Sequence, residues 1–167
     1  IAEARDGKRG PENVWGSAAT GAVLSILICL NLGQKDLLLL AFSASFAAKL
    51  ADTFGSEIGK RWGRTTVLIT NLKPVPPGTD GGITFQGTLA SLLGSSLMTY
   101  SMVTIGIVPL NQYAIYIVLI GFISTLSESF FGAIIQNKYS IFSNEFANFL
   151  QTLFAALITL LFLHSNI

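Results

Sequence analysis

Residues 37–60 read LLLLAFSASFAAKLADTFGSEIGK, an apolar run that acquires charged side chains only in its second half. About 20 mostly apolar residues are enough for a helix to cross the hydrocarbon core of a bilayer, which is about 30 Å thick. The stretch from Leu37 to about Ile58 therefore predicts a membrane-spanning helix. Its charges need an explanation, because a charged side chain at the centre of such a helix costs about 2.5–3.5 kcal/mol on insertion scales.

The same apolar character extends over the whole chain. Of its 167 residues 51% are hydrophobic and 11% are charged, whereas a soluble domain has about 25% charged residues. The alternative is a soluble helical bundle. It is disfavoured, because the apolar runs are joined by short loops and the helices would have no polar faces to expose to water. We therefore expect an all-α, polytopic membrane helical bundle with about five transmembrane helices, with approximate bounds 14–32, 37–58, 83–108, 112–136 and 146–164.

We expect residues 1–167 to form a single membrane domain. The chain begins with Ile1 rather than Met, and a polar segment from Glu3 to Asn13 precedes the first apolar run. This start lacks the charged stub, short apolar core and cleavage site of a signal peptide. We expect the chain to be the C-terminal part of a longer protein.

Lys and Arg are distributed unevenly between the two ends of the expected helices. One side carries eight of them and the other side has Lys35 alone. Basic residues concentrate in cytoplasmic loops, so we expect the loop between the second and third spans to face the cytoplasm or, in a plastid, the stroma. The eight residues are Arg5, Lys8, Arg9, Lys60, Arg61, Arg64, Lys73 and Lys138.

The scarcity of titratable residues excludes several functions. A net charge of +1 provides no field that could hold a nucleic acid along the protein. One Cys rules out an internal disulfide framework, and one His rules out a cluster of His ligands around a metal. Any metal ion must therefore bind oxygen ligands.

One face of the second span is polar. At 100° per residue its polar side chains fall within about 80° of arc, with Glu57 at the margin. A functional site is the favoured interpretation, and the alternative is a contact of Lys49 with Asp52 or Thr53 that closes a helix interface. The polar face consists of Ser45, Lys49, Asp52, Thr53, Ser56 and Lys60.

The loop between the second and third spans contains the run KPVPPGTDGG at residues 73–82. Its three closely spaced prolines exclude a helix, and its glycines permit positive φ and a close approach to a ligand. The N–H groups of such a loop can cradle phosphate oxygens, with Lys73 adding a positive charge. A rigid connecting loop is the alternative. The earlier run GSEIGKR at residues 55–61 is not a Walker loop, because its glycines are too close and no hydroxyl follows Lys60.

The other spans also carry polar side chains at helical spacing. Small residues on one face of the third span predict close helix packing. An intramembrane Glu such as Glu128 is rarely without a function. These side chains are Thr84, Thr88, Ser91 and Ser95 in the third span, Ser124, Ser127 and Glu128 in the fourth, and Asn144, Asn148 and Gln151 in the fifth.

Four carboxylates lie near the expected cytoplasmic ends of their elements, as do the basic residues: Asp52, Glu57, Asp80 and Glu128. Mg²⁺ prefers one or two carboxylates together with phosphate oxygens and water, so this combination suits Mg²⁺ and a phosphorylated substrate. A nucleotide would arrive from the cytoplasm, and a lipid acceptor would enter from the bilayer between helices.

These considerations assign a role to each candidate residue. Asp52, Glu57 and Glu128 are the predicted catalytic carboxylates and the predicted Mg²⁺ ligands. The predicted nucleotide-phosphate contacts are Lys73, Gly78, Thr79, Asp80, Gly81 and Gly82, the predicted acceptor-phosphate contacts are Lys49 and Lys60, and the predicted supporting polar residues are Thr53, Ser56, Asn144 and Asn148.

Several long motifs are distributed along the whole chain: RG at 9–10, NVWGS at 13–17, ADTFGSEIGK at 51–60, LKPVPPGTDGG at 72–82, QGTLA at 86–90, SESFFGA at 127–133 and NEFAN at 144–148. Together they resemble the integral-membrane family that contains transmembrane protein 19 and the plant and cyanobacterial phytyl-phosphate kinases. Full-length relatives in this family have additional membrane helices before the region of Arg9. At position 128 the chain has Glu, and in this it resembles the plant-type enzymes of the family.

The resemblance implies phosphorylation of phytyl phosphate to phytyl diphosphate, a step in tocopherol biosynthesis, in a plastid membrane or in the inner membrane of a cyanobacterium or other bacterium. A more distant similarity to CTP-dependent dolichol and phytol kinases and cytidylyltransferases makes CTP the leading nucleotide. The alternatives are a prenol kinase or cytidylyltransferase on the same scaffold, or a transporter of a phosphorylated lipid. Release of nucleoside diphosphate, of pyrophosphate or of neither would separate these three functions.

Overall fold

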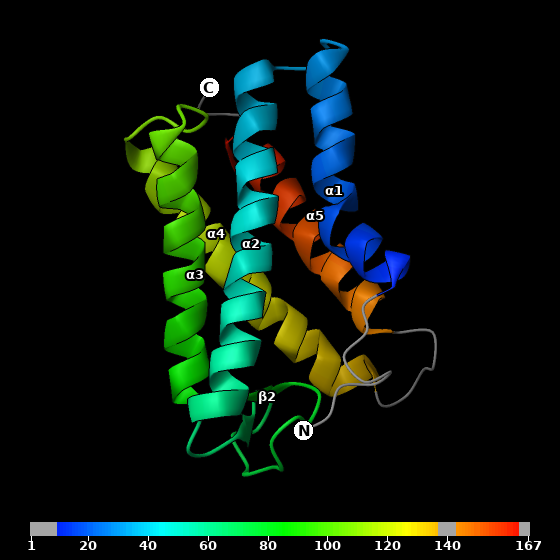
Figure 1. Cartoon of the computed structure of the whole chain (residues 1–167), viewed down its shortest axis with the longest axis vertical. Coiled ribbons are helices and arrows are strands. Elements are labelled where there is room, and N and C mark those ends of the chain that lie inside the picture. The colour runs from blue at the N-terminus through cyan, green and yellow to red at the C-terminus, as the bar shows by residue number, and fades with distance from the viewer. Residues whose placement is uncertain (1–9, 137–142, 164–167) are drawn as a thin grey trace.

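The computed structural model describes residues 10–136 and 143–163, and in these ranges the chain is mostly helical (Figure 1). The predicted all-α fold is confirmed. Four of the basic residues counted for the orientation, Arg5, Lys8, Arg9 and Lys138, lie outside the described residues. The elements are α1 (Pro11–Cys29), α2 (Lys35–Trp62), β1 (Val67–Leu68), β2 (Gly82–Ile83), α3 (Phe85–Thr104), α4 (Gln112–Phe131), the π-helical turn η2 (Gly132–Gln136) and α5 (Asn144–Leu163).

Four of these helices are long and apolar enough to cross a membrane: α1, α2, α4 with its continuation to Ile134, and α5. The predicted third span forms the 20-residue helix α3, which has sufficient length but is less apolar, because serine and threonine side chains recur along it. The described residues thus form five long helices, as predicted, and four of them have the length and hydropathy of a membrane span.

α2 is the central helix of the bundle and packs against each of the other four (Figure 1). Its 28 residues extend over about 42 Å at 1.5 Å per residue. Fully buried alanines form much of its inner face, and such small side chains let neighbouring helices approach closely. They are Ala41, Ala44, Ala47, Ala48 and Ala51.

The second half of α2 packs on the first half of α3 through glycines. A Cβ atom at Gly87 would lie 2.8 Å from the carbonyl oxygen of Gly55 and 3.1 Å from the Cα atom of Gly59, so a larger residue requires a backbone shift. Gly55 and Gly59 are four residues apart, which places both on the face that approaches α3. The run that superficially resembles a phosphate-binding loop is therefore a helix-packing motif. The packing predicted for Ser91 is observed, because its hydroxyl faces Gly55.

Buried polar side chains connect α5 to the other helices. Gln151 Nε2 donates hydrogen bonds to the carbonyl oxygen of Ala48 at 3.0 Å and to Thr125 Oγ1 at 2.9 Å. The hydroxyls of Thr20 in α1 and Thr152 in α5 share a buried hydrogen bond of 2.9 Å. Interhelical bonds of this kind contribute about 0.6 kcal/mol each on average in membrane proteins. They fix how far each helix is displaced along its neighbours.

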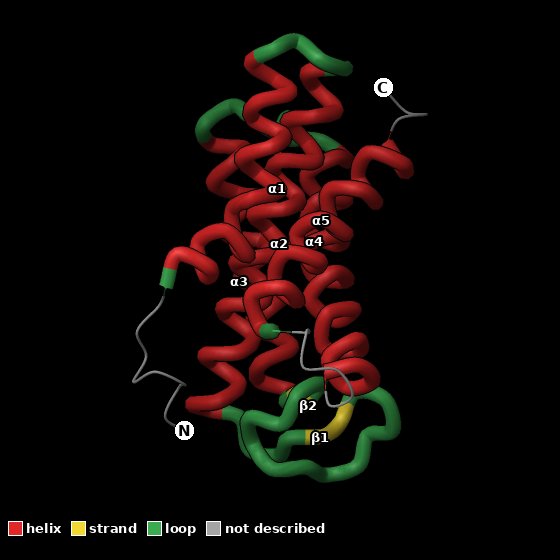
Figure 2. The backbone as a smooth tube through the Cα atoms, turned by 90° about the vertical axis from the view of Figure 1, so that its right-hand side faces the viewer, coloured by secondary structure: helices red, strands yellow, loops and turns green. Residues whose placement is uncertain are grey.

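The chain between α2 and α3 forms a small hairpin at one end of the bundle (Figure 2). β1 and β2 pair antiparallel, with Val67 opposite Ile83. Gly78 and Gly81 have φ values of 87° and 74°, which favour glycine, so the turn uses the conformational freedom predicted for two of its glycines. A Cβ atom at Gly81 would lie 2.7 Å from the backbone nitrogen of Ala133, so this turn rests on η2, directly after α4. The prediction of a non-helical, glycine-shaped loop is confirmed.

Candidate functional site

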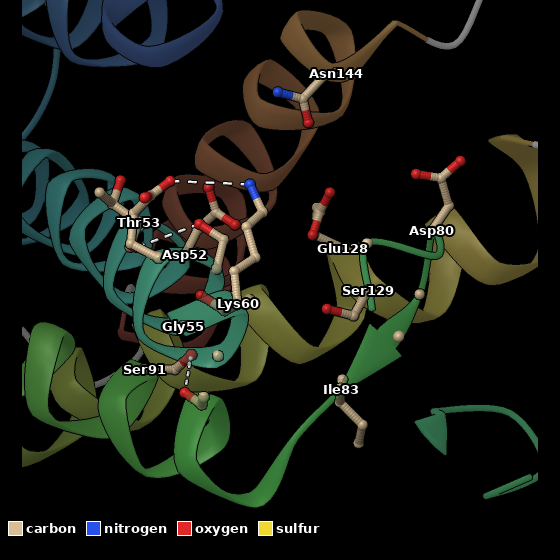
Figure 3. A pocket seen from close by; sticks show the side chains of 18 of the residues that line it. Asp52, Thr53, Gly55, Lys60, Asp80, Ile83, Ser91, Glu128, Ser129 and Asn144 are labelled. Carbon is tan, nitrogen blue, oxygen red and sulfur yellow. Dashed lines mark hydrogen bonds and ion pairs between the residues drawn. The ribbon is translucent and has the colours of Figure 1, made fainter. Parts of the chain in front are cut away.

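A polar cavity of about 520 Å³ lies beside the hairpin, where the end of α2 meets the start of α3 (Figure 3). Its volume falls within the range of about 300–1,000 Å³ that is usual for ligand pockets. Its walls come from all five helices and from the loop that precedes β2. Segments far apart in the sequence therefore contribute to one space.

Nearly all residues to which the sequence assigns a role line this cavity. α2 and the loop supply most of them, and α4 and α5 complete the wall. They are Lys49, Asp52, Thr53, Ser56, Glu57, Lys60, Gly78, Thr79, Asp80, Gly81, Gly82, Glu128, Asn144 and Asn148. The structure thus brings the candidate residues together, while their individual roles stay predictions.

Lys73 is the exception, because it is exposed and does not line the cavity. In the hairpin the backbone N–H of Leu68 donates to the carbonyl oxygen of Lys73 at 2.9 Å, which holds Lys73 at the turn that follows β1. The chain reaches the cavity again only from Pro77 onward. The sequence shows that Lys73 is close to the glycines along the chain, but it does not show the hairpin register. In this structure Lys73 therefore lies outside the cavity in which it was predicted to contact nucleotide phosphates.

Lys49 is held by partners on two helices. Its Nζ donates to Asp52 Oδ2 at 2.8 Å and to Asn148 Oδ1 of α5 at 2.7 Å. The interface contact considered as the alternative role of Lys49 is therefore present, with Asp52 as its partner, while the hydroxyl of Thr53 donates to the backbone carbonyl of Lys49 at 3.0 Å. The Lys49 and Asp52 side chains are only 22% and 19% exposed. Pairing explains how both charges are tolerated inside the helix bundle.

Lys60 and Glu57 lie at the exposed rim of the cavity. The distance from Lys60 Nζ to Glu57 Oε1 is 3.9 Å, and the two side chains are 43% and 55% exposed. An exposed ion pair of this kind stabilises a protein very little. Lys60 can therefore exchange Glu57 for an anionic ligand at low cost.

Glu128 borders the cavity from α4. Figure 3 shows it between the side chains of α2 and Asp80 of the glycine-rich loop. Within residues 10–136 and 143–163 its carboxylate makes no hydrogen bond or ion pair. A carboxylate in a membrane helix is costly unless a cation, a donor or water compensates its charge. Glu128 is therefore the carboxylate best prepared to accept a new partner in this space.

The three carboxylates predicted to bind Mg²⁺, Asp52, Glu57 and Glu128, do not form a ready-made metal cluster. In the part of the chain that the structure describes, no three side chains of His, Cys, Asp or Glu lie close enough together to hold a metal ion. The side chains around the cavity nevertheless offer oxygen ligands, and Mg²⁺ needs only one or two carboxylates when phosphate oxygens and water complete its coordination. The residues therefore fit a Mg²⁺ ion that enters with a phosphorylated ligand.

The start of α1 also lines the cavity, which the sequence alone did not reveal. Asn13 and Ser17 face it from the first two turns of the helix. Both belong to the NVWGS motif, and their spacing of four residues puts them on one face, which is the signal that could have identified them. Gly16 packs against the backbone of Glu145 and brings this end of α1 to the start of α5.

Membrane-crossing helices with a charged cavity at one end define an integral membrane protein that has a site for a polar ligand. The chain belongs to the family "Integral membrane protein DUF92", which matches residues 1–156. The family predicted from the sequence motifs is thereby confirmed. No solved structure matches the chain.

Three relatives illustrate the range of the family. The chain is 42% identical over 161 residues to an uncharacterized membrane protein of Synechocystis sp., and this match covers 96% of the chain and 62% of that relative. It is 37% identical over 166 residues to "Protein VTE6, chloroplastic" of Arabidopsis thaliana, covering 96% of the chain and 50% of that relative. It is 33% identical over 148 residues to an uncharacterized membrane protein of Methanocaldococcus jannaschii, covering 86% and 59%. The chain thus spans about half to three-fifths of the length of these relatives.

Proposed function

We propose that the whole protein transfers a phosphoryl group from a nucleoside triphosphate to an isoprenoid lipid monophosphate such as phytyl phosphate. The observation that carries this proposal is the cavity at one end of the membrane helices, which combines two lysines, several carboxylates and a glycine-rich loop. Membership of the DUF92 family and the similarity to a chloroplastic plant relative agree with the resemblance to phytyl-phosphate kinases.

The reaction requires that two groups of phosphates approach each other. An oxygen of the lipid phosphate attacks the γ-phosphorus, and the bond from this phosphorus to the leaving nucleoside diphosphate breaks. Positive charge must offset the repulsion between the phosphates, because transfer depends mainly on positioning and electrostatic stabilisation. Lys60 at the rim and Lys49 inside the cavity supply this charge for the acceptor, and the N–H groups of the turn at residues 78–82 can receive nucleotide phosphates.

Mg²⁺ is the cofactor that suits this chemistry, since it neutralises charge on the transferred group when bound. Asp52 and Glu128 are the residues that would hold it together with phosphate oxygens. CTP is the proposed donor, on the basis of the distant similarity to CTP-dependent lipid kinases.

We further propose that the site faces the cytoplasm or, in a plastid, the stroma. Three exposed basic residues, Lys60, Arg61 and Arg64, lie at the hairpin end, whereas Lys35 lies at the opposite end of α2. The exposed Cys29 ends α1 at that opposite end and serves as a reference. In sealed cells, native Cys29 should react with an impermeant thiol reagent from outside, and Arg64→Cys in a Cys29→Ser background should not. Outside labelling at position 64 would reverse the proposed orientation.

The activity is tested with the purified full-length protein, phytyl phosphate and each nucleoside triphosphate in turn, followed by analysis of the lipid and nucleotide products. We expect phytyl diphosphate and a nucleoside diphosphate, formed most efficiently with CTP. Pyrophosphate release with a nucleotide-linked lipid would identify a cytidylyltransferase instead. Lipid movement between the leaflets of a vesicle, with no nucleotide-dependent product, would identify a transporter.

A further inference from the structure

A second cavity, of about 330 Å³, lies between α4 and α5 and has an almost entirely apolar lining. Residues 124–132 form one wall and residues 147–157 the other, and we call this space the α4–α5 groove. Several of its side chains reach the outer surface of the bundle, since Phe131, Leu150, Phe154 and Leu157 are all more than one-third exposed. The groove therefore faces the hydrocarbon of a surrounding bilayer.

Glu128 connects the two cavities. Its side chain lines the polar cavity together with Thr125 and Ser129, and it also lines the α4–α5 groove together with Ser124 and Phe131. The groove is thus an apolar extension of the polar cavity that begins at Glu128. A ligand with one charged end and one apolar chain matches this sequence of environments.

Two polar atoms of residues in the groove wall lack partners. Ser124 Oγ and Gln151 Oε1 are buried and form no hydrogen bond within the described parts of the chain. Ser124 is fully buried and Gln151 is 3% exposed, and Ser124 lies one helical turn before Glu128. A phosphate oxygen at this junction can accept a hydrogen bond from the Ser124 hydroxyl, and an ordered water can donate one to Gln151 Oε1, whereas a purely apolar chain can do neither.

We propose that the α4–α5 groove binds the isoprenoid chain of the acceptor lipid, whose phosphate extends past Glu128 into the polar cavity toward Lys49 and Lys60. This inference rests on the proposed function, because it names where the acceptor of that reaction lies. The wall from Ala147 to Leu157 is about 15 Å long at 1.5 Å per residue, and a space between two helices suits one chain better than the two chains of a phospholipid. The lipid enters sideways from the bilayer without leaving the membrane.

Chain-length selectivity tests the groove in the full-length protein. Leu157 lies in the wall six residues beyond Gln151, so a Leu157→Trp substitution fills the part that a long chain occupies. We expect kcat/KM for the 20-carbon phytyl phosphate to fall at least tenfold, and kcat/KM for the 10-carbon geranyl phosphate to fall less than threefold. Leu119→Trp is the matched control, because Leu119 is 45% exposed, as against 46% for Leu157, and does not line the groove. An unchanged ratio between the two substrates in Leu157→Trp would overturn the inference.

A binding experiment separates failure of this inference from failure of the proposed function. A 20-carbon prenyl phosphate with a photoreactive group on its chain is cross-linked to the wild-type protein without nucleotide, and the labelled residues are identified by mass spectrometry. We expect label in α4 and α5, removed by excess phytyl phosphate but not by a phospholipid. Label confined to α1 or α3, or label that phytyl phosphate does not remove, would refute the groove even if the protein is an active kinase. Competable label in α4 and α5 would support the groove even if no phosphoryl transfer occurs.

Discussion

The two faces of the second half of α2 differ sharply in what they pack against. Toward α3 the helix presents Gly55 and Gly59, and the two backbones approach so closely that no side chain fits between them at Gly87. Toward α4 and α5 it presents Lys49 and Asp52, and the space there stays open as the polar cavity. Close packing on one face of α2 can therefore position charged side chains on the opposite face of the same half of the helix.

The largest expected effect comes from changing the charged face. Asp52→Asn removes the carboxylate charge but keeps an oxygen that can accept from Lys49. We expect turnover of the lipid phosphate to fall at least a hundredfold, or about 2.7 kcal/mol at 1.36 kcal/mol per factor of ten, in steady-state kinetics. Asp36→Asn in the exposed first turn of the same helix is the control and should keep normal activity. Near-normal activity of Asp52→Asn with an unchanged Mg²⁺ dependence would exclude Asp52 from the reaction.

A substitution in the α2–α3 interface should lower the stability of the protein. Gly87→Val places side-chain atoms where a Cβ atom alone would lie 2.8 Å from the Gly55 carbonyl oxygen. Overpacking of this kind costs about 1–3 kcal/mol, so we expect a clearly lower unfolding midpoint in detergent. Leu89→Val on the same helix, at a side chain that is 48% exposed, should change stability by less than about 0.5 kcal/mol. Equal unfolding midpoints for Gly87→Val and wild type would show that the α2–α3 interface is packed less tightly than the distances at Gly87 indicate.

A smaller effect on substrate binding should distinguish Lys60 at the rim of the polar cavity from Lys73 outside it. Lys60→Gln should raise KM for the substrate phosphates about tenfold, because Lys60 lines the cavity and its pairing with Glu57 is weak. Lys73→Gln should change kcat and KM by less than about twofold, since Lys73 does not line the cavity. A larger effect at Lys73 than at Lys60 would mean that the hairpin closes over the ligand. Initial rates at varied nucleotide and lipid concentrations provide this comparison.

The polar face of α2 could be predicted because it depends only on helical spacing. Lys49, Asp52 and Lys60 line one cavity, as the 100° period indicates. The deeper end of the predicted face behaves differently, because Ser45 is buried and its hydroxyl donates to the carbonyl oxygen of Phe42 in its own helix. Local periodicity shows which residues share a face but not how much of that face borders a cavity.

Features that depend on partners distant in the sequence could not be predicted. The role of Gly55 and Gly59 depends on Gly87, which lies in the next helix. The exclusion of Lys73 depends on the pairing of Leu68 with Lys73 in the hairpin. The contribution of Asn13 depends on the packing of α1 against α5. In each case tertiary contacts decide between arrangements that the local sequence permits equally.

We propose that the polar cavity receives a lipid that is already phosphorylated. The most direct measurement compares kcat/KM for phytyl phosphate and for phytol in the full-length protein, with the same nucleotide and Mg²⁺. An uncharged alcohol offers the lysines of the cavity no phosphate to bind, so the monophosphate should be the better substrate by at least about a hundredfold, or about 2.7 kcal/mol. Similar values for the two lipids, or phosphorylation of phytol alone, would contradict the claim and identify the protein as a prenol kinase.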